Sequence, residues 1–403
     1  MRVLLVGSGG REHAIGWKLA QSQRVKELIS LPGNPGLAEL GPVVEGIGAD
    51  DVGAIAAMAR IQAVDLVVVG PEAPLAAGVA DAIGRLGIPV FGPTRAAARL
   101  ESSKSFAKAV MTRAGVATGD TESFTDPDAA KTHIDRSDGP YVVKADGLAG
   151  GKGVLVTGSR ADATSWVDHW IETGPVVIEE YLDGPEVSVF AVCTASGAMP
   201  LEPARDYKRL LEGDEGPNTG GMGSYSPVAD LPTGLVDETM RSVVDPTLAQ
   251  MREDGNPFTG FLYAGLILTD DGPKVLEFNV RLGDPETQAV LPRMTSDFLD
   301  VLEGARPEWS DECTVNVVLA AKGYPTAPEK GAEIRGIDGR PGKGVLVFHA
   351  GTVSEGKKVF VDGGRVLNVV GIGDSIDMAR DRAYTAAERI TWPGVQYRRD
   401  IAD

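Results

Sequence analysis

Short apolar runs alternate with helical patterns through the first hundred residues, and this alternation restricts the fold more than any other feature of the sequence. Four runs read as buried strands, each followed by glycine or proline turn signals: Val3–Val6, Leu28–Leu31, Leu66–Val69 and Pro89–Phe91. Helical spacing is present at Ala14–Ala20, Val52–Ala63 and Pro74–Leu86. Strands separated by helices predict a doubly wound α/β domain with a parallel sheet, which binds ligands at the carboxyl ends of its strands.

The pattern changes after residue 101 to helices mixed with hairpin strands. Lys104–Ala114 reads as a helix ended by Gly115, and Tyr141–Lys144 pairs with Gly153–Thr157 in a predicted β-hairpin. A helix at Asp162–Thr173 and a strand at Val176–Glu179 complete a compact α+β unit. A second sheet is expected from the strands Val187–Cys193, Phe261–Thr269 and Lys274–Asn279.

The last ninety residues predict an antiparallel β domain. Its strand-like segments are Cys313–Ala321, Gly344–His349, Lys358–Val361 and Arg365–Gly373, followed by a helix at Ile376–Ile390. The fold class is therefore a multidomain α/β and α+β protein. We divide it into an N-terminal domain over residues 1–101, a central domain over 102–312 with a lid subdomain at about 120–185, and a C-terminal domain over 313–403.

Charge and cysteine usage exclude several classes of function. The net charge of −18 repels nucleic acid and anionic lipid, and no apolar run approaches the length of a membrane helix. Cys193 and Cys313 have no metal-like spacing with each other or with the four histidines, so we expect a reduced pair in a cytoplasmic protein. The 51 glycines in 403 residues, without any collagen period, indicate tight turns and close backbone approaches to ligands.

Gly7-Ser8-Gly9-Gly10-Arg11-Glu12 lies between a predicted strand and a helix, where glycines and a helix N-terminus favour anion binding. Arg11 can add a bidentate phosphate contact. The segment is not a dinucleotide fingerprint, because Glu12 replaces the third glycine. No acidic residue follows the second strand at Leu31-Pro32-Gly33 to bind a ribose. The alternative to anion binding is a purely structural turn.

A second glycine-rich loop, Lys144–Gly153, joins strand to strand. It is not a Walker loop, because Asp146 replaces the first required glycine and Gly153 replaces the serine or threonine that binds magnesium. A hairpin that combines four glycines with Lys144 and Lys152 is typical of a mobile lid over a polyphosphate. Solvated surface lysines are the alternative interpretation.

Glu277-Phe278-Asn279 is the strongest metal signal. Residues i and i+2 of a strand point to one face, so the two oxygen-bearing side chains converge. Hard oxygen ligands suit Mg²⁺ or Mn²⁺, which complete their coordination with phosphate oxygens and water. Arg281 continues the same face and could neutralise a transferring phosphoryl group. An ordinary half-exposed strand, with Arg281 in a structural ion pair, would show the same alternation.

With these motifs in place, the chain resembles the glycinamide ribonucleotide synthetases, or phosphoribosylamine–glycine ligases, of the ATP-grasp superfamily. The resemblance covers essentially the whole length. It rests on Val6–Ala14, Val69–Leu75, Phe91–Thr94, Val143–Val154, Asp206–Lys208, Gly216–Gly223, Glu277–Asn279 and Arg281–Thr287. Gly216–Gly223 and Arg281–Thr287 are the segments most specific to this ligase. Tyr207 stands where the family commonly has histidine, and Lys322 where glycine is expected.

The resemblance implies that glycine and ATP form glycyl phosphate, which the amine of 5-phosphoribosylamine then attacks. The ATP-binding residues it implies are Lys104, Lys144, Gly147, Gly150, Gly151, Lys152, Gly153, Glu179, Glu180, Leu182 and Glu186. Substrate-binding residues are expected at Gly9, Gly10, Arg11, Asn34, Glu72, Asn218, Thr219, Gly220 and Asp284. Arg281 and Asp206 are the catalytic candidates, Asp206 as the group that binds the ammonium of glycine, and Glu277 and Asn279 are the metal ligands. Any general base is left unassigned.

Three alternatives remain open at this stage. A nicotinamide-dependent oxidoreductase would use the Gly7–Gly10 loop but leaves Glu277 and Asn279 unexplained. A non-catalytic ATP-binding regulator of the same fold would be expected to lack a metal ligand or Arg281. An ATP-grasp enzyme with another acceptor, such as a carboxylase of an imidazole ribonucleotide, is opposed only by the resemblance. The expected partners are small molecules, with the chain a monomer or weak dimer.

Overall fold

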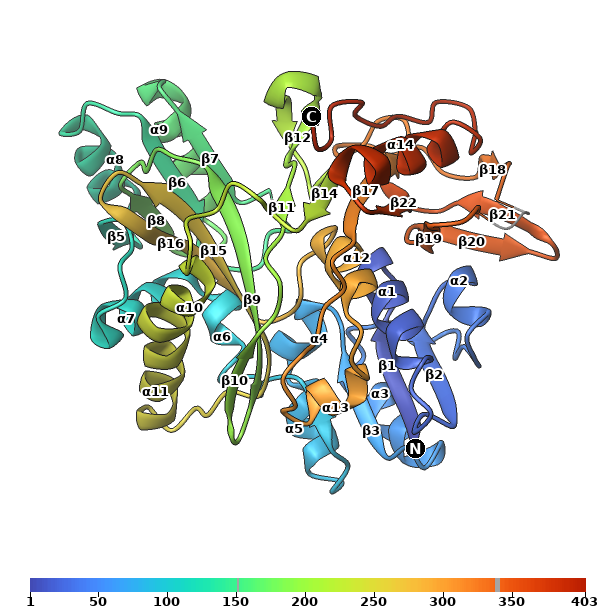
Figure 1. Ribbon diagram of the computed structural model, residues 1–403. Helices are drawn as coiled ribbons and strands as arrows, with labels where there is room; N and C mark the ends of the chain where they lie inside the picture. Colours follow the sequence, from blue (N-terminus) through green and yellow to red (C-terminus); the bar gives the residue numbers. More distant parts are fainter. Residues whose placement is uncertain (151, 338–340) are drawn as a thin grey trace.

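The amino-terminal sheet is parallel, with the strand order β2–β1–β3–β4 (Figure 1). Its strands are β1 (Arg2–Gly7), β2 (Glu27–Pro32), β3 (Leu66–Val69) and β4 (Val90–Phe91). The computed structural model describes residues 1–150, 152–337 and 341–403. Because β2 and β3 flank β1 on opposite sides, the strand order reverses at β1. The loops after β1 and β3 therefore meet at one edge, as the predicted doubly wound sheet requires.

The helices of this domain are α1 (Gly10–Leu19), α2 (Pro35–Ala38), α3 (Val52–Ile61), α4 (Glu72–Ala77), α5 (Val79–Gly84) and α6 (Arg99–Ser102). The prediction of one helix over residues 74–86 is wrong. Gly78 adopts a φ of 94° and ends α4, because the left-handed conformation stops the helix there. Helix α1 begins earlier than expected, inside the glycine loop itself, so the first turn presents backbone N–H groups at the sheet edge.

The predicted lid subdomain is a four-stranded antiparallel sheet, β5–β8–β6–β7, with a core of its own. Its elements are β5 (Thr121–Phe124), α8 (Pro127–Asp135), β6 (Tyr141–Ala145), β7 (Val154–Thr157), α9 (Arg160–Trp170) and β8 (Val176–Glu179). Strands β6 and β7 form the expected hairpin. Helix α7 (Lys104–Ala114) precedes the subdomain.

A second antiparallel sheet, β10–β9–β15–β16, lies between the lid and the amino-terminal domain (Figure 1). It comprises β9 (Glu186–Thr194), β10 (Gly197–Pro200), β15 (Gly260–Thr269) and β16 (Gly272–Asn279), which confirms the second predicted sheet. Val189, Leu262 and Phe278 of this sheet share one buried cluster with Leu4 and Val6 of β1. The two domains therefore pack through a continuous core. Helices α10 (Leu235–Thr239) and α11 (Asp245–Glu253), joined by the π-helix η2 (Met240–Val244), follow β14.

The carboxyl-terminal domain is built on a five-stranded antiparallel sheet, β11–β14–β17–β22–β19. Its strands are β11 (Arg205–Asp206), β14 (Gly223–Ser226), β17 (Cys313–Ala320), β19 (Val345–His349) and β22 (Arg365–Gly373). Two of these strands come from the middle of the chain, so the sheet crosses the domain boundary that we place at residue 313. Hydrogen-bonded strands on both sides of that boundary tie the central and C-terminal domains together.

Smaller elements complete the fold. A three-stranded sheet contains β18 (Glu333–Ile334), β21 (Lys358–Val361) and β20 (Thr352–Glu355), and β12 (Arg209–Leu211) pairs with β13 (Glu215–Asn218). The remaining helices are the 3₁₀ turns η1 (Glu212–Asp214) and η3 (Leu291–Arg293), with α12 (Glu286–Val290), α13 (Phe298–Leu302) and α14 (Ile376–Ala387). Within the described ranges, no helix combines the length and apolar character needed to span a bilayer.

Two histidines join the amino-terminal and carboxyl-terminal domains. The Nδ1 atom of His13 on α1 accepts a hydrogen bond from the backbone N–H of His349 on β19, at 2.8 Å. Both rings are buried. Burial, with the nearby His349, lowers the pKa of His13 to about 3, and burial lowers the pKa of His349 to about 4. Both residues are therefore neutral in the folded protein at neutral pH.

The buried, neutral state of His13 and His349 predicts that the folded protein loses stability in mild acid. Unfolded histidine titrates near pH 6.5, so the unfolded chain binds more protons below that pH and the stabilisation falls as pH drops from about 6.5 toward the folded values. Between pH 7.5 and 5.5, each histidine should reduce the free energy of unfolding by about 1.4 kcal/mol. Urea unfolding of wild type and His13→Gln at both pH values tests this. The variant should lose about 1.4 kcal/mol less than wild type over this interval; an equal loss would contradict the prediction.

Candidate active site

The loop after β1 is shaped by Glu12, the residue that replaces the third glycine of a dinucleotide fingerprint. Its carboxylate accepts from the backbone N–H of Gly9 at 2.7 Å and pairs with the Nε of Arg11 at 2.5 Å. A Cβ atom at Gly70, after β3, would lie 2.3 Å from Glu12 Oε1. Glycine is therefore required at position 70 because a buried carboxylate occupies the space. Glu12 therefore fixes the loop through its contacts with Gly9 and Arg11.

Arg281 connects the amino-terminal domain to the end of β16. Its guanidinium lies 3.5 Å from a carboxylate oxygen of Glu72 and 3.3 Å from one of Glu101, and it donates to Asn279 Oδ1 at 2.9 Å. Glu72 in turn lies 3.9 Å from Arg11. Four residues predicted for the site, from two domains, thus form one chain of contacts.

Glu277 and Asn279 lie side by side, as the period of a strand predicts. Asn279 Nδ2 donates to Glu277 Oε1 at 3.4 Å. Although burial of the Glu277 carboxylate opposes the shift, the positive charges of Lys144, Lys208 and Lys104 lower its pKa below the usual range. An ionised carboxylate beside an amide offers the oxygen donors that Mg²⁺ and Mn²⁺ prefer. The described residues contain no cluster of three His, Cys, Asp or Glu side chains, so other ligands would have to come from phosphate and water.

Lys144 links the lid to the metal candidates. Its Nζ lies 2.7 Å from Glu179 Oε2 and donates to the backbone carbonyl of Leu276 at 3.3 Å. Lys108 approaches the same Glu179 oxygen at 3.4 Å. Both Lys144 and Glu179 are buried. The lysine predicted to grip phosphate and the strand bearing the predicted metal ligands therefore share one location.

The glycine hairpin is anchored at its base to the start of α7. Asp146 Oδ1 accepts from the backbone N–H of Lys104 at 2.5 Å, and Lys104 Nζ donates to the carbonyl of Gly147 at 3.0 Å. Lys152 and Gly150 are exposed beyond this anchor, whereas Gly153 is buried. Gly151 lies outside the described residues. The phosphate contacts and the lid motion remain predictions.

Three further residues predicted to bind ATP, Glu180, Leu182 and Glu186, differ in their surroundings. Glu180 is exposed, with a carboxylate oxygen 3.5 Å from Lys274 Nζ, and Leu182 is half-buried. Glu186 forms an ion pair with Lys208, which also lies 3.3 Å from Asp206 Oδ1. The sequence alone predicts no role for Lys208. Lys208 therefore places Glu186, a predicted ATP-binding residue, next to Asp206, the residue predicted to bind the ammonium of glycine.

The remaining substrate candidates lie where the three domains meet. Asp284 Oδ2 is 3.3 Å from Arg365 Nη2 and 3.5 Å from the position a Cβ would take at Gly9. Gly220 contacts Arg365 as well, while Asn218 is exposed at the end of β13. A Cβ at Gly10 would lie 2.2 Å from Asn368 Nδ2. Two residues of β22 thus approach the amino-terminal loop and its neighbours.

The side chain of Asn34 contacts the backbone of the loop after β1 and of β19. Its side-chain nitrogen donates to the carbonyls of Ser8 and His349 at 2.8 and 2.9 Å, and its side-chain oxygen accepts from the N–H of Leu37 at 2.9 Å. The oxygen caps the short helix α2. The side chain therefore holds the loop after β1, and a direct contact with substrate remains a prediction.

Two buried carboxylates near the candidate residues, Glu101 and Glu286, are not among the residues predicted from the sequence. Burial raises the pKa of Glu101 to about 7, and its carboxylate accepts from the N–H of Val280 at 2.8 Å. Burial, followed by the charge of Asp206, raises the pKa of Glu286, whose Oε1 accepts from Ser188 Oγ at 3.1 Å. Glu286 lies within Arg281–Thr287, one of the segments that carry the resemblance. No local sequence pattern marks Glu101, because only tertiary contacts bury it.

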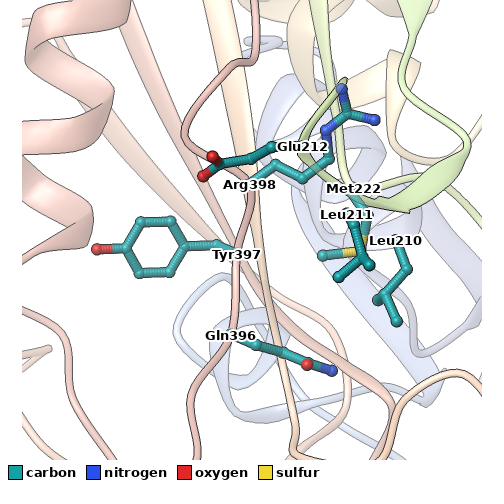
Figure 2. A pocket seen from close by; sticks show the side chains of 7 residues that line it. All are labelled: Leu210, Leu211, Glu212, Met222, Gln396, Tyr397 and Arg398. Atoms are coloured by element: carbon teal, nitrogen blue, oxygen red, sulfur yellow. The ribbon is translucent and has the colours of Figure 1, made fainter. Parts of the chain in front are cut away.

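A separate hollow of about 340 Å³ shares no lining residue with these candidates. It is lined by Leu210, Leu211, Glu212, Met222, Gln396, Tyr397 and Arg398 (Figure 2). Arg398 is engaged with Asp214 and Asp400 at 2.7 and 2.6 Å and stacks over Tyr207. Tyr207, at the position where the resemblance implies a histidine, accepts from the N–H of Ala402 at 2.9 Å. The Tyr207 hydroxyl is therefore engaged by the backbone of the carboxyl-terminal domain.

Comparison with known proteins identifies the family. Phosphoribosylglycinamide synthetase domains match in order: the N domain over residues 1–101, the ATP-grasp (A) domain over 102–287 and the C domain over 314–403. The phosphoribosylamine–glycine ligase of Streptomyces coelicolor is 48% identical over 414 residues, covering 100% of this chain and 99% of the relative. The chain belongs to the phosphoribosylglycinamide synthetase family.

Solved structures agree with this membership. The crystal structure of phosphoribosylamine–glycine ligase from Thermotoga maritima superposes with a TM-score of 0.87 at 38% identity, covering 100% of both chains. The biotin carboxylase domain of the 2-oxoglutarate carboxylase from Hydrogenobacter thermophilus has a TM-score of 0.74 at 18% identity, covering 98% of this chain and 91% of that one. The second likeness shows the ATP-grasp fold alone. Family membership removes the oxidoreductase alternative.

Proposed function

We propose that this chain ligates glycine to 5-phosphoribosylamine with ATP, giving glycinamide ribonucleotide, ADP and phosphate. The observation that carries the proposal is the convergence of Glu277, Asn279 and Arg281 at the end of β16. Lys144 approaches this row from the lid and Glu72 from the amino-terminal domain. Acid, amide, guanidinium and ammonium groups at one place suit phosphoryl transfer to a carboxylate.

Glu277 and Asn279 would hold Mg²⁺ or Mn²⁺. The fit rests on their oxygen donors and on the ionised state of Glu277. A bound divalent ion would supply charge neutralisation at the phosphates. Lys104 and Lys144 would grip the same phosphates, with the glycine hairpin as the lid above them.

The first chemical step is attack of a glycine carboxylate oxygen on the γ-phosphorus of ATP, which forms glycyl phosphate as the bond to ADP breaks. Arg281 would stabilise the charge on the transferring group, and Asp206 would bind the ammonium of glycine. In the second step the amine of phosphoribosylamine attacks the acyl carbon, phosphate leaves, and the amine loses one proton. Arg11, Glu72 and the N-terminus of α1 would hold this acceptor.

The proposal also includes a setting for the reaction. The substrates are small molecules of purine synthesis, and we propose a cytoplasmic enzyme that acts as a monomer or weak dimer. The domain boundaries at residues 101 and 312 are part of the same proposal. The excess of negative charge over the whole chain means that anionic substrates depend on the local cluster of Lys, Arg and backbone N–H groups.

The proposed activity is tested by measuring ADP release from ATP and Mg²⁺ with glycine, with freshly made phosphoribosylamine, and with both. Release should depend on both co-substrates, and glycinamide ribonucleotide should appear in equal amount. Release that is indifferent to glycine would remove the ligase assignment. Turnover with bicarbonate and an imidazole ribonucleotide in place of glycine and phosphoribosylamine would favour the carboxylase alternative.

A further inference from the structure

The carboxyl-terminal domain reaches the substrate side of the site through Arg365, the first residue of β22. Its Nη1 donates to the backbone carbonyl of Asp284 at 2.6 Å and also to that of Gly220. Its Nη2 lies 3.3 Å from Asp284 Oδ2. One guanidinium from a third domain therefore joins two segments that both contain predicted substrate-binding residues.

Tyr324 completes the contact with Gly220. The backbone N–H of Gly220 donates to the Tyr324 hydroxyl at 2.8 Å, so the two carboxyl-terminal side chains engage both backbone polar groups of this residue. A Cβ at Gly364 would lie 2.4 Å from Tyr324 Cδ2, which means that the tyrosine ring lies against the residue just before Arg365 and β22. The pair is thus held as one unit.

Gly220 lies in the loop between β13 and β14, residues 219–222, which we call the Gly220 loop. The opposite side of this loop is held by the central domain. Thr219 Oγ1 donates to the carbonyl of Lys208 at 2.8 Å, next to Asp206. Gly221 adopts a φ of 108°, and a Cβ there would lie 2.4 Å from Pro285 Cδ. The loop is therefore wedged between Pro285 and Arg365, and its position depends on both.

The electrostatics of Asp284 give Arg365 a second effect. Burial favours the protonated form, but the charges of Arg365 and Arg11 lower the pKa of this carboxyl below its usual range. Gln288 Nε2 donates to the other oxygen at 2.8 Å. Without Arg365, less positive charge would compensate the ionised Asp284 carboxylate, which lies close to Gly9 and would face the phosphate of the substrate.

We propose that Arg365 and Tyr324 form a clamp through which the carboxyl-terminal domain positions the Gly220 loop and Asp284 around phosphoribosylamine. The inference rests on the proposed function, because it takes these two segments as the surface that binds that substrate. Arg365 is a positioning residue, since it acts through Gly220 and Asp284. Lys144 and Glu179, which are predicted to bind ATP, pair with each other in the lid subdomain.

Steady-state kinetics of clamp variants test this. Arg365→Met should raise KM for phosphoribosylamine about 10- to 100-fold, because it removes charge-assisted hydrogen bonds. Tyr324→Phe removes only the hydroxyl and should raise the same KM about 2- to 10-fold. KM for ATP should stay at the wild-type value in both. Arg365→Lys should recover part of the loss, since one ammonium can pair with Asp284 but cannot span both carbonyls.

The matched control is Lys358→Met, which removes an exposed cation of the same domain that pairs with Glu333 at 3.1 Å. Because Arg365 and Tyr324 share Gly220, their effects in the double variant should be smaller than the product of the single effects. Wild-type KM for phosphoribosylamine in Arg365→Met would overturn the clamp, as would a parallel rise in KM for ATP. Absence of glycine-dependent ADP release in the wild type would instead overturn the proposed function.

Discussion

Replacing Glu277 with glutamine is expected to lower kcat about a thousandfold or more, because the carboxylate would hold a divalent ion that supplies several kcal/mol of charge stabilisation at the phosphates. Glutamine has the same shape, so the contact with Asn279 at 3.4 Å can persist. The variant instead removes the negative charge that faces Lys144, Lys104 and Lys208. Turnover should be measured across a Mg²⁺ titration, in which the variant should require a higher concentration.

The control for this prediction is Glu253→Gln, at the exposed end of α11. It makes the same chemical change away from the site and should keep the wild-type kcat and metal dependence. Circular dichroism should show the same folded content in both variants. Wild-type turnover in Glu277→Gln would dismiss the metal assignment.

Replacing Arg281 with alanine is expected to lower kcat about 100- to 1000-fold, equivalent to about 2.7 to 4 kcal/mol in the barrier. The structure predicts a second, separate effect on stability. Arg281 is the ion-pair partner of the buried Glu101, at 3.3 Å. Breaking such a pair typically costs about 3 to 5 kcal/mol. Because the pKa of Glu101 is about 7, this carboxyl can take up a proton and reduce the cost.

The double variant Arg281→Ala with Glu101→Gln separates the two effects. Glutamine removes the buried charge and can still accept from the N–H of Val280. Stability in urea should therefore return toward wild type, while kcat should stay at the level of Arg281→Ala. Recovery of kcat together with stability would show that Arg281 acts only through the fold.

Local patterns are sufficient to predict part of the geometry around the candidate residues. The period of a strand placed Glu277 and Asn279 side by side, and glycine density placed the hairpin that starts at Lys144. Glu12 in place of the third glycine predicts that this is not a dinucleotide loop, and in the structure its buried carboxylate contacts Gly9 within the same loop. In each case the determining contacts lie within a few residues of the motif or on one strand.

The other contributors to the site are brought together only by the tertiary structure. Arg365 reaches Gly220 across 145 residues of sequence, and its position in β22 has no local signature. Glu101 is buried because the end of β16 packs over it, as its hydrogen bond from Val280 shows. Asn34 was correctly placed at a strand end, but its amide is engaged by the backbone. Hydrophobic periodicity alone predicts one helix over residues 74–86, whereas in the structure Gly78 ends α4 within that range.

A crystal structure with a non-hydrolysable ATP analogue and Mg²⁺ tests the arrangement of hairpin and strand most directly. The prediction is a metal ion about 2.1 Å from oxygens of Glu277 and Asn279, with Lys144 within hydrogen-bond distance of a phosphate oxygen. A nucleotide whose phosphates lie out of reach of both Lys144 and Glu277 would contradict it.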